Sequence, residues 1–137
     1  MATGHPVSFR LDGKVLKQLE RRARELGTNR TALAERYLRE GVRMDEHPAI
    51  VFRDGLGGRR AALGGTRLDV WQVVDTVRKS VDVDEAAEYL NVPVAKVRAA
   101  MRYYSAFKTE VDQWARRARE RAETEEQGWR REQEVNA

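Results

Sequence analysis

The chain has 137 residues, enough for one domain or two very small ones, and it contains no cysteine, which excludes a disulfide framework. No apolar run approaches the roughly 18–20 residues that span a bilayer, and the opening "MATGHPVSF" lacks the pattern of a signal peptide. We therefore expect a cytoplasmic protein with no membrane partner. Lysine and arginine outnumber aspartate and glutamate by 26 to 22, and the net charge of +4 permits a polyanionic partner.

The first predicted element is a short strand over residues 7–11. Val7, Phe9 and Leu11 alternate with Ser8 and Arg10, which is the period of a strand with one buried face. A single strand of this length leaves its whole edge of N–H and C=O groups without partners. Pairing within the chain's own fold, with Arg10 as a solvated surface charge, is one interpretation; pairing with a second copy is the other.

Two helices are predicted next, each with a capping residue. Asp12 is a predicted N-cap, Gly27 is a residue that can end the first helix, and Asn29 is the predicted N-cap of the second. The apolar residues at helical spacing are Val15, Leu16, Leu19, Ala23 and Leu26 in the first helix, and Leu33, Ala34, Tyr37, Leu38 and Val42 in the second.

One strand and two helices amount to a segment that is too small for an independent core. Two copies that pair their strands antiparallel and intertwine their helices would bury Val7, Phe9 and Leu11 in a shared core. The resulting two-stranded ribbon fits the major groove of B-DNA, and Arg10 suits the paired acceptors of guanine. We therefore expect a homodimer that forms through the N-terminal strand.

The stretch "PVSFRLDGKVLKQLERRARELGTNRTALAERYL" resembles the ribbon-helix-helix repressors of the CopG, MetJ and Arc type in the order and spacing of its elements. The resemblance implies that Ser8 and Arg10, with Pro6 at the edge, contact DNA bases. It also implies that the start of the second helix contacts phosphate through Asn29, Arg30 and Thr31. The proline is a departure, because it brings no side chain that reads a base, so specificity would rest on fewer contacts.

Residues 46–111 predict a small helix-turn-helix domain with a β-hairpin. "AIVF" and "RRAAL" can pair across "RDGLGG", and helical periodicity returns at Val70. "VDVDEAAEYLNVPVAKVRAAMRYY" predicts two helices, with Asp82 or Asp84 as the first cap and Asn91 at the turn. A possible second DNA surface on the later helix comprises Lys96, Arg98 and Arg102. Protein interaction, or plain solvation of these charges, is the alternative interpretation.

This second part resembles the small domain of VapB-class antitoxins, which are paired with PIN-type ribonuclease toxins. The matching pieces are "GTRLDVWQVVDTV", "EAAEYLNVPVAKVRAAMRYY" and "TEVDQW", within residues 48–114. The resemblance implies an autoregulating antitoxin whose C-terminal region masks a toxin protein. Residues 112–137 are predicted to form a charged helix that frays after about Gln127, with a partner-binding face at Trp114, Ala118 and Ala122. A helix that stays in solvent or caps its own domain is the alternative.

Catalytic and metal-binding chemistry is not expected. His5 and His47 are the two histidines, one near the terminus and one beside a proline, and both are expected to be surface residues. Ser8, Ser80 and Ser105 have no histidine and carboxylate arranged around them, and no cysteine or histidine set has metal-ligand spacing. The "GLGGRR" stretch is better explained by a tight turn than by a dinucleotide loop. We expect no enzyme activity and no cofactor.

The predicted architecture is mainly α. Residues 1–45 would form a ribbon-helix-helix domain for dimerisation and DNA binding, residues 46–111 the helix-turn-helix domain with its hairpin, and residues 112–137 a charged tail. The net charges of these segments are +4, +1 and −1, which favours the first for contact with double-stranded operator DNA. The expected function is a transcriptional repressor that serves as an antitoxin. A regulator without a toxin and a dimeric protein-interaction adaptor are the alternatives.

Overall fold

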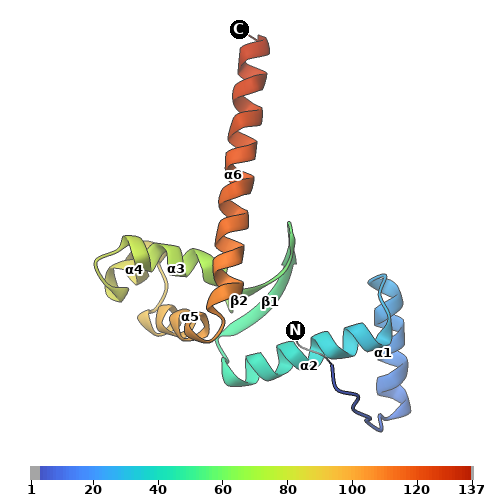
Figure 1. The fold of residues 1–137 in the computed structure, drawn as a ribbon. Helices are drawn as coiled ribbons and strands as arrows, with labels where there is room; N and C mark the ends of the chain where they lie inside the picture. The colour runs from blue at the N-terminus through green and yellow to red at the C-terminus, as the bar shows by residue number, and fades with distance from the viewer. Residues whose placement is uncertain (1–3, 137) are drawn as a thin grey trace. The chain divides into compact units, whose positions relative to one another are not determined.

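The computed structural model describes residues 4–136 and is mainly helical, with one small antiparallel sheet (Figure 1). In chain order the elements are α1 (Gly13–Glu25), α2 (Arg30–Glu46), β1 (Ile50–Gly55), β2 (Gly58–Leu63), α3 (Val70–Lys79), α4 (Val83–Leu90), α5 (Val94–Ala106) and α6 (Lys108–Asn136). They fall into two compact units, one ending at Val42 and one beginning at Arg43. None of the helices in the described range is long and apolar enough to cross a membrane.

Both predicted caps of the first unit are confirmed. The Asp12 side chain accepts a hydrogen bond from the Lys14 N–H at 2.7 Å, which fixes the start of α1. The Asn29 side chain accepts one from the Ala32 N–H at 2.9 Å and fixes the start of α2. Between the helices, Gly27 has a φ of 69°, a left-handed conformation that favours glycine.

The predicted strand over residues 7–11 is not formed in this single chain. Residues 4–12 have no regular secondary structure, and the sheet of the described residues comes after α1 and α2. The physical reason is that a strand needs a partner for its backbone groups, and residues 4–42 of this unit contain no other strand. Residues 1–3 and 137, at the outer ends of the predicted segments 1–45 and 112–137, lie outside the described residues.

The predicted hairpin is confirmed in the second unit. β1 and β2 pair antiparallel from Ile50 opposite Leu63 to Gly55 opposite Gly58. The two-residue loop needs a left-handed conformation at Gly57, whose φ is 86°. The hairpin places Leu63 in the core of the unit, where it is completely buried.

The helix-turn-helix is confirmed as a packing arrangement. Asp82 is the N-cap of α4 and accepts a hydrogen bond from the Glu85 N–H at 2.8 Å. Asn91 takes the left-handed conformation with φ 55° at the turn, and α5 follows directly after Pro93. The core between the hairpin, α3, α5 and the start of α6 includes Ile50, Leu63, Val70, Val73, Val74, Val97 and Tyr103.

The C-terminal helix differs from its prediction in both bounds. α6 begins at Lys108, so the predicted boundary at residue 112 falls inside its first turn or two, and it continues to Asn136 without fraying at Gln127. Val111 and Ala115 are buried against the second unit, which explains the early start. From Ala122 to Asn136 every side chain is exposed. Figure 1 shows this half of α6 extending beyond the hairpin and α3–α5.

Candidate nucleic-acid interface

The first unit carries a groove bordered by the extended N-terminal segment, α1 and α2. Its volume is about 910 Å³. Four of the predicted DNA-contacting residues line it: Pro6, Ser8, Arg30 and Thr31. Arg10 and Asn29 do not line this groove, and Arg10 is exposed without an ion pair in the described chain. The structure therefore brings together residues that the sequence places more than twenty positions apart.

The same unit has a large apolar surface and very little core. Among its described apolar residues, only Ala23 and Leu33 are buried. Val7 and Phe9 are 68% and 67% exposed. A second, mostly apolar groove of about 570 Å³ is lined by Phe9, Leu11, Val15, Leu19, Tyr37 and Leu38, with Gln18, Arg21, Arg22 and Ala34. The apolar residues of the predicted strand thus lie at a surface that the described part of the unit does not cover.

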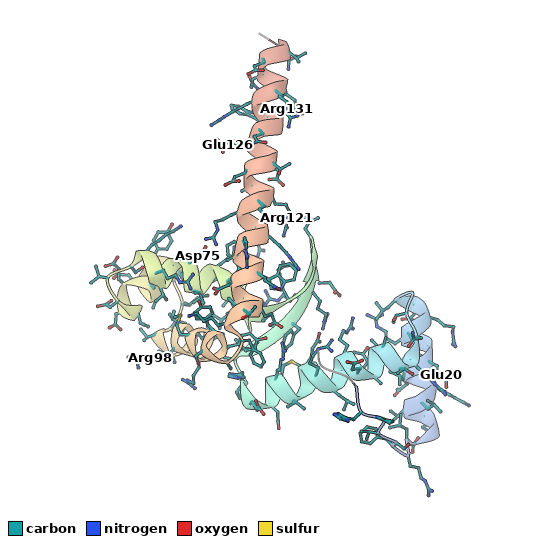
Figure 2. All side chains as sticks on the ribbon, in the orientation of Figure 1. Glu20, Asp75, Arg98, Arg121, Glu126 and Arg131 are labelled. Carbon is teal, nitrogen blue, oxygen red and sulfur yellow. The ribbon has the colours of Figure 1, made fainter. Side chains whose placement is uncertain are left out.

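The start of α2 combines a positive helix end with an arginine. Its first turn contains no acidic residue, so the partial positive charge of the free N–H groups is not neutralised there. Arg30 is exposed, and its Nη1 lies 3.5 Å from Oε1 of Glu20. Glu20 is labelled on α1 in Figure 2. Asn29 uses its side chain as the helix cap, and Thr31 is exposed. This end of α2 is suited to holding a phosphate.

The three residues of the possible second DNA surface have different surroundings in the structure. Lys96 Nζ donates a hydrogen bond to the Gly64 carbonyl at 2.5 Å, so this ammonium group ties α5 to the loop after the hairpin. Arg98 and Arg102 are exposed and make no ion pair within residues 4–136. The neighbouring helix α4 has Asp84 and Glu85 in its first turn, and these carboxylates would repel a phosphate backbone.

The three predicted partner-binding residues on α6 also have different surroundings. The Trp114 ring packs against the glycine turn of the hairpin, with the Arg117 guanidinium 5.1 Å from the ring centre. Trp114 and Ala118 border a cavity of about 270 Å³ together with Leu56, Arg60, Asp69, Trp71 and Arg121. Ala122 is fully on the exposed half of the helix. Trp114 therefore serves the fold of its own unit.

Sequence reasoning did not find the partly buried ion pair between Arg60 and Asp69 in the wall of this cavity. Arg60 Nε donates to Asp69 Oδ2 at 2.5 Å, and Trp71 Nε1 donates to the same oxygen at 3.2 Å. The Asp69 N–H donates to the Gln72 side chain at 2.8 Å, which starts α3. The "DVWQ" spacing could have indicated this cap, because an acidic residue three positions before glutamine is typical of a helix start. Nothing local pointed to Arg60.

A second network joins the end of α2 to α5 and α6. Arg43 Nη1 donates to Glu110 at 2.8 Å and to the Tyr103 hydroxyl at 3.1 Å, and that hydroxyl donates to Glu110 at 2.7 Å. Burial, followed by the bond to Glu110, raises the pKa of Tyr103 above its usual value. The arginine also lies 4.0 Å from the ring centre of Phe107. These contacts hold the second unit together.

Three of the histidines and serines that were considered for catalysis contact other groups of the fold, and the other two are exposed. His47 packs edge-on against Tyr103, with 5.3 Å between ring centres. Ser80 and Ser105 each donate to a backbone carbonyl of their own helix region, at 2.6 and 2.7 Å. His5 and Ser8 are exposed. In the described part of the chain, no group of three histidine, cysteine, aspartate or glutamate residues could hold a metal ion.

The groove of about 910 Å³ in the first unit therefore brings apolar residues and the basic Arg30 together, all of them predicted from the sequence to be functional. The second unit contributes exposed Arg98 and Arg102 and the free half of α6. No protein-family model, curated protein or solved structure matches this chain.

Proposed function

We propose that the protein is a homodimeric, sequence-specific DNA-binding repressor that reads DNA with a ribbon made of two copies of residues 7–11. The observation that carries this proposal is the uncovered apolar row of Val7, Phe9 and Leu11. These side chains alternate with polar ones as in a half-buried strand, yet they lie 68%, 67% and 47% exposed in the single chain. A second copy would supply both a strand partner and an apolar face.

The small core of the first unit supports the same arrangement. With Ala23 and Leu33 as its buried apolar residues, this unit is below the size at which a core of its own is sufficient. Pairing two units would cover the groove at Phe9, Val15 and Leu38 from both copies. Identical surfaces then meet around a two-fold axis, the usual arrangement in homodimers.

The opposite face of the paired strands would meet DNA. In a paired strand, alternation would point Ser8 and Arg10 away from the apolar face, and Arg10 makes no ion pair in the described chain. Arg10 could contact guanine in the major groove, while Arg30 and the N–H groups at the start of α2 hold a phosphate. Base contacts would provide specificity and phosphate contacts would fix the position of the ribbon.

DNA binding is tested by fluorescence anisotropy with the protein's own promoter and a scrambled duplex at two salt concentrations. We expect the promoter to bind more tightly than the scrambled duplex at the higher salt. Arg10→Ala should lower promoter affinity by about 1–3 kcal/mol with little effect on the scrambled duplex. Arg30→Ala should weaken both duplexes alike and reduce the salt dependence. Arg116→Ala, an equal charge change on exposed α6, is the control.

Equal binding of the two duplexes that disappears with salt would refute the proposal and favour the adaptor role. Dimerisation is tested separately by sedimentation equilibrium of Phe9→Asp, which places a carboxylate in the shared core. We expect this variant to lose the N-terminal dimer and, with it, promoter binding. A variant that keeps its wild-type mass and affinity would show that the strand face is not the interface.

The antitoxin role is a second candidate, favoured by the exposed half of α6. A helix that extends into solvent from Ala122 to Asn136 with an exposed Trp129 can lie in a groove of another protein. Co-expression tests this role, with any small ribonuclease that is found to be encoded beside this gene. Recovery of a complex that inhibits the ribonuclease would support the antitoxin role, and the absence of such a neighbour would favour a regulator without a toxin.

A further inference from the structure

The exposed half of α6 lacks the packing that normally stabilises a helix. From Ala122 to Asn136 no side chain is buried, and Trp129 is 60% exposed. Gly128 lies in its interior, where glycine costs about 1 kcal/mol relative to alanine. A free helical segment of about 12–15 residues is marginal in water, because most helix stability in proteins comes from an apolar face packed on a neighbour.

The apolar face of α6 continues from the core into solvent. At 3.6 residues per turn, Trp129 lies about five turns after Val111 and points in the same direction. Ala118 and Ala122 lie between them on that face. Val111 is buried in the second unit, Ala118 is half-buried, and Ala122 and Trp129 are exposed. The face that the unit uses at one end of the helix is therefore unpartnered at the other.

Charges beside this face change sign at Ala122. Arg119, whose Nη1 lies 3.9 Å from Oδ2 of Asp75 in the same chain, and Arg121 precede it, and Glu125 and Glu126 follow it. Figure 2 shows Arg121 close to the level of the hairpin and Glu126 further along the exposed half. Arg121 makes no ion pair in the described chain, whereas Glu126 pairs with Arg130 at 2.7 Å within the exposed half. A second α6 running in the opposite direction would present the complementary order of charges.

We propose that the exposed halves of two α6 helices from two copies of the chain pair antiparallel. With the two-fold axis between Ala122 and Glu125, Arg121 of each copy meets Glu125 of the other. The same alignment sets Trp129 on the small side chain of Ala118. A parallel pair is disfavoured, because it would place Glu125 against Glu125 of the second copy.

The alignment also gives Trp129 a place to pack. Ala118 borders the cavity of about 270 Å³ whose other walls include Leu56 and Trp114. Leu56 is 76% exposed at the tip of the hairpin, so the mouth of the cavity offers apolar surface to an incoming indole. This pairing is independent of the N-terminal strand, so together the two interfaces would join dimers into larger assemblies. A toxin bound to the same helix would have to displace it.

Sedimentation equilibrium of the full chain separates the two interfaces. We expect the wild type to exceed a dimer at high concentration, Phe9→Asp to form a dimer through α6, and Trp129→Ala to form a dimer through the N-terminal strand. The double variant should be monomeric. Trp129→Ala should weaken α6 pairing by at least about tenfold, as expected for a central aromatic contact. A Trp129→Ala chain with the wild-type concentration dependence would overturn the pairing, whereas a Phe9→Asp chain unchanged from wild type would instead overturn the N-terminal dimer.

Charge exchange gives the sharper test, in the Phe9→Asp background. Arg121→Glu alone places two carboxylates together in the pair, and Glu125→Arg alone places two guanidinium groups together, so each should be monomeric. An equimolar mixture restores both oppositely charged contacts and should dimerise. Arg116→Glu makes the same charge change on the other side of α6 and should leave dimerisation unchanged. A mixture that stays monomeric, or single variants that dimerise like their parent, would overturn the proposal and leave the exposed face to a different protein.

Discussion

Removing the carboxylate of Asp69 should destabilise the second unit strongly. This group accepts hydrogen bonds from Arg60 at 2.5 Å and from the Trp71 indole at 3.2 Å, and the two charged side chains are only 23% and 11% exposed. Removing one partner of a buried ion pair lowers the free energy of unfolding by roughly 3–5 kcal/mol, because the remaining charge stays desolvated. Since Arg60 keeps some contact with water, we expect Asp69→Ala to lower the free energy of unfolding by about 2–4 kcal/mol.

Urea denaturation followed by circular dichroism measures this loss. Asp54→Ala is the matched control, because Asp54 also pairs with an arginine of the hairpin, Arg59 at 3.3 Å, but is 71% exposed. We expect that control to cost less than about 1 kcal/mol. Asp69→Asn should lie between the two, since it keeps an acceptor for the indole while removing the charge. Equal effects of Asp69→Ala and Asp54→Ala would refute the argument from burial.

Three further changes test other contacts of the second unit by the same assay. Gly55→Ala should lower the free energy of unfolding by about 1 kcal/mol, because the new Cβ would lie 1.7 Å from Arg60 Nη1 and displace that guanidinium. An unchanged urea midpoint would contradict this close approach. Asn91→Ala should be less stable than Asn91→Gly by about 1 kcal/mol, because the φ of 55° is left-handed, and equal stabilities would argue against that conformation. Tyr103→Phe should cost about 1–3 kcal/mol through the lost bond to Glu110. Because the pKa of Tyr103 is raised in the folded chain, wild-type stability should fall as the pH rises above about 10, and Tyr103→Phe should lose less over that range.

Features that depend on neighbouring residues in the chain could be predicted from the sequence alone. The caps at Asp12 and Asn29 were predictable, and that of α4 was limited to Asp82 or Asp84, because a short side-chain acceptor reaches N–H groups two or three positions away. The left-handed turn at Asn91 and the glycine turn of the hairpin follow from backbone sterics at single positions. The apolar spacing predicted the helices before α6 by the same local logic, whereas α6 was predicted from its charged composition.

Only the tertiary structure decided what individual charged and aromatic side chains do. Lys96 was predicted as a possible DNA contact, yet it binds the Gly64 carbonyl 32 positions away. Trp114 was predicted to meet a partner, yet it packs on the hairpin turn of its own unit. Asp69 at the start of α3 accepts a hydrogen bond from Arg60 of the hairpin. Such contacts depend on how elements meet in space, and a long flexible side chain has the same local sequence pattern whether it reaches solvent, a carbonyl or a nucleic acid.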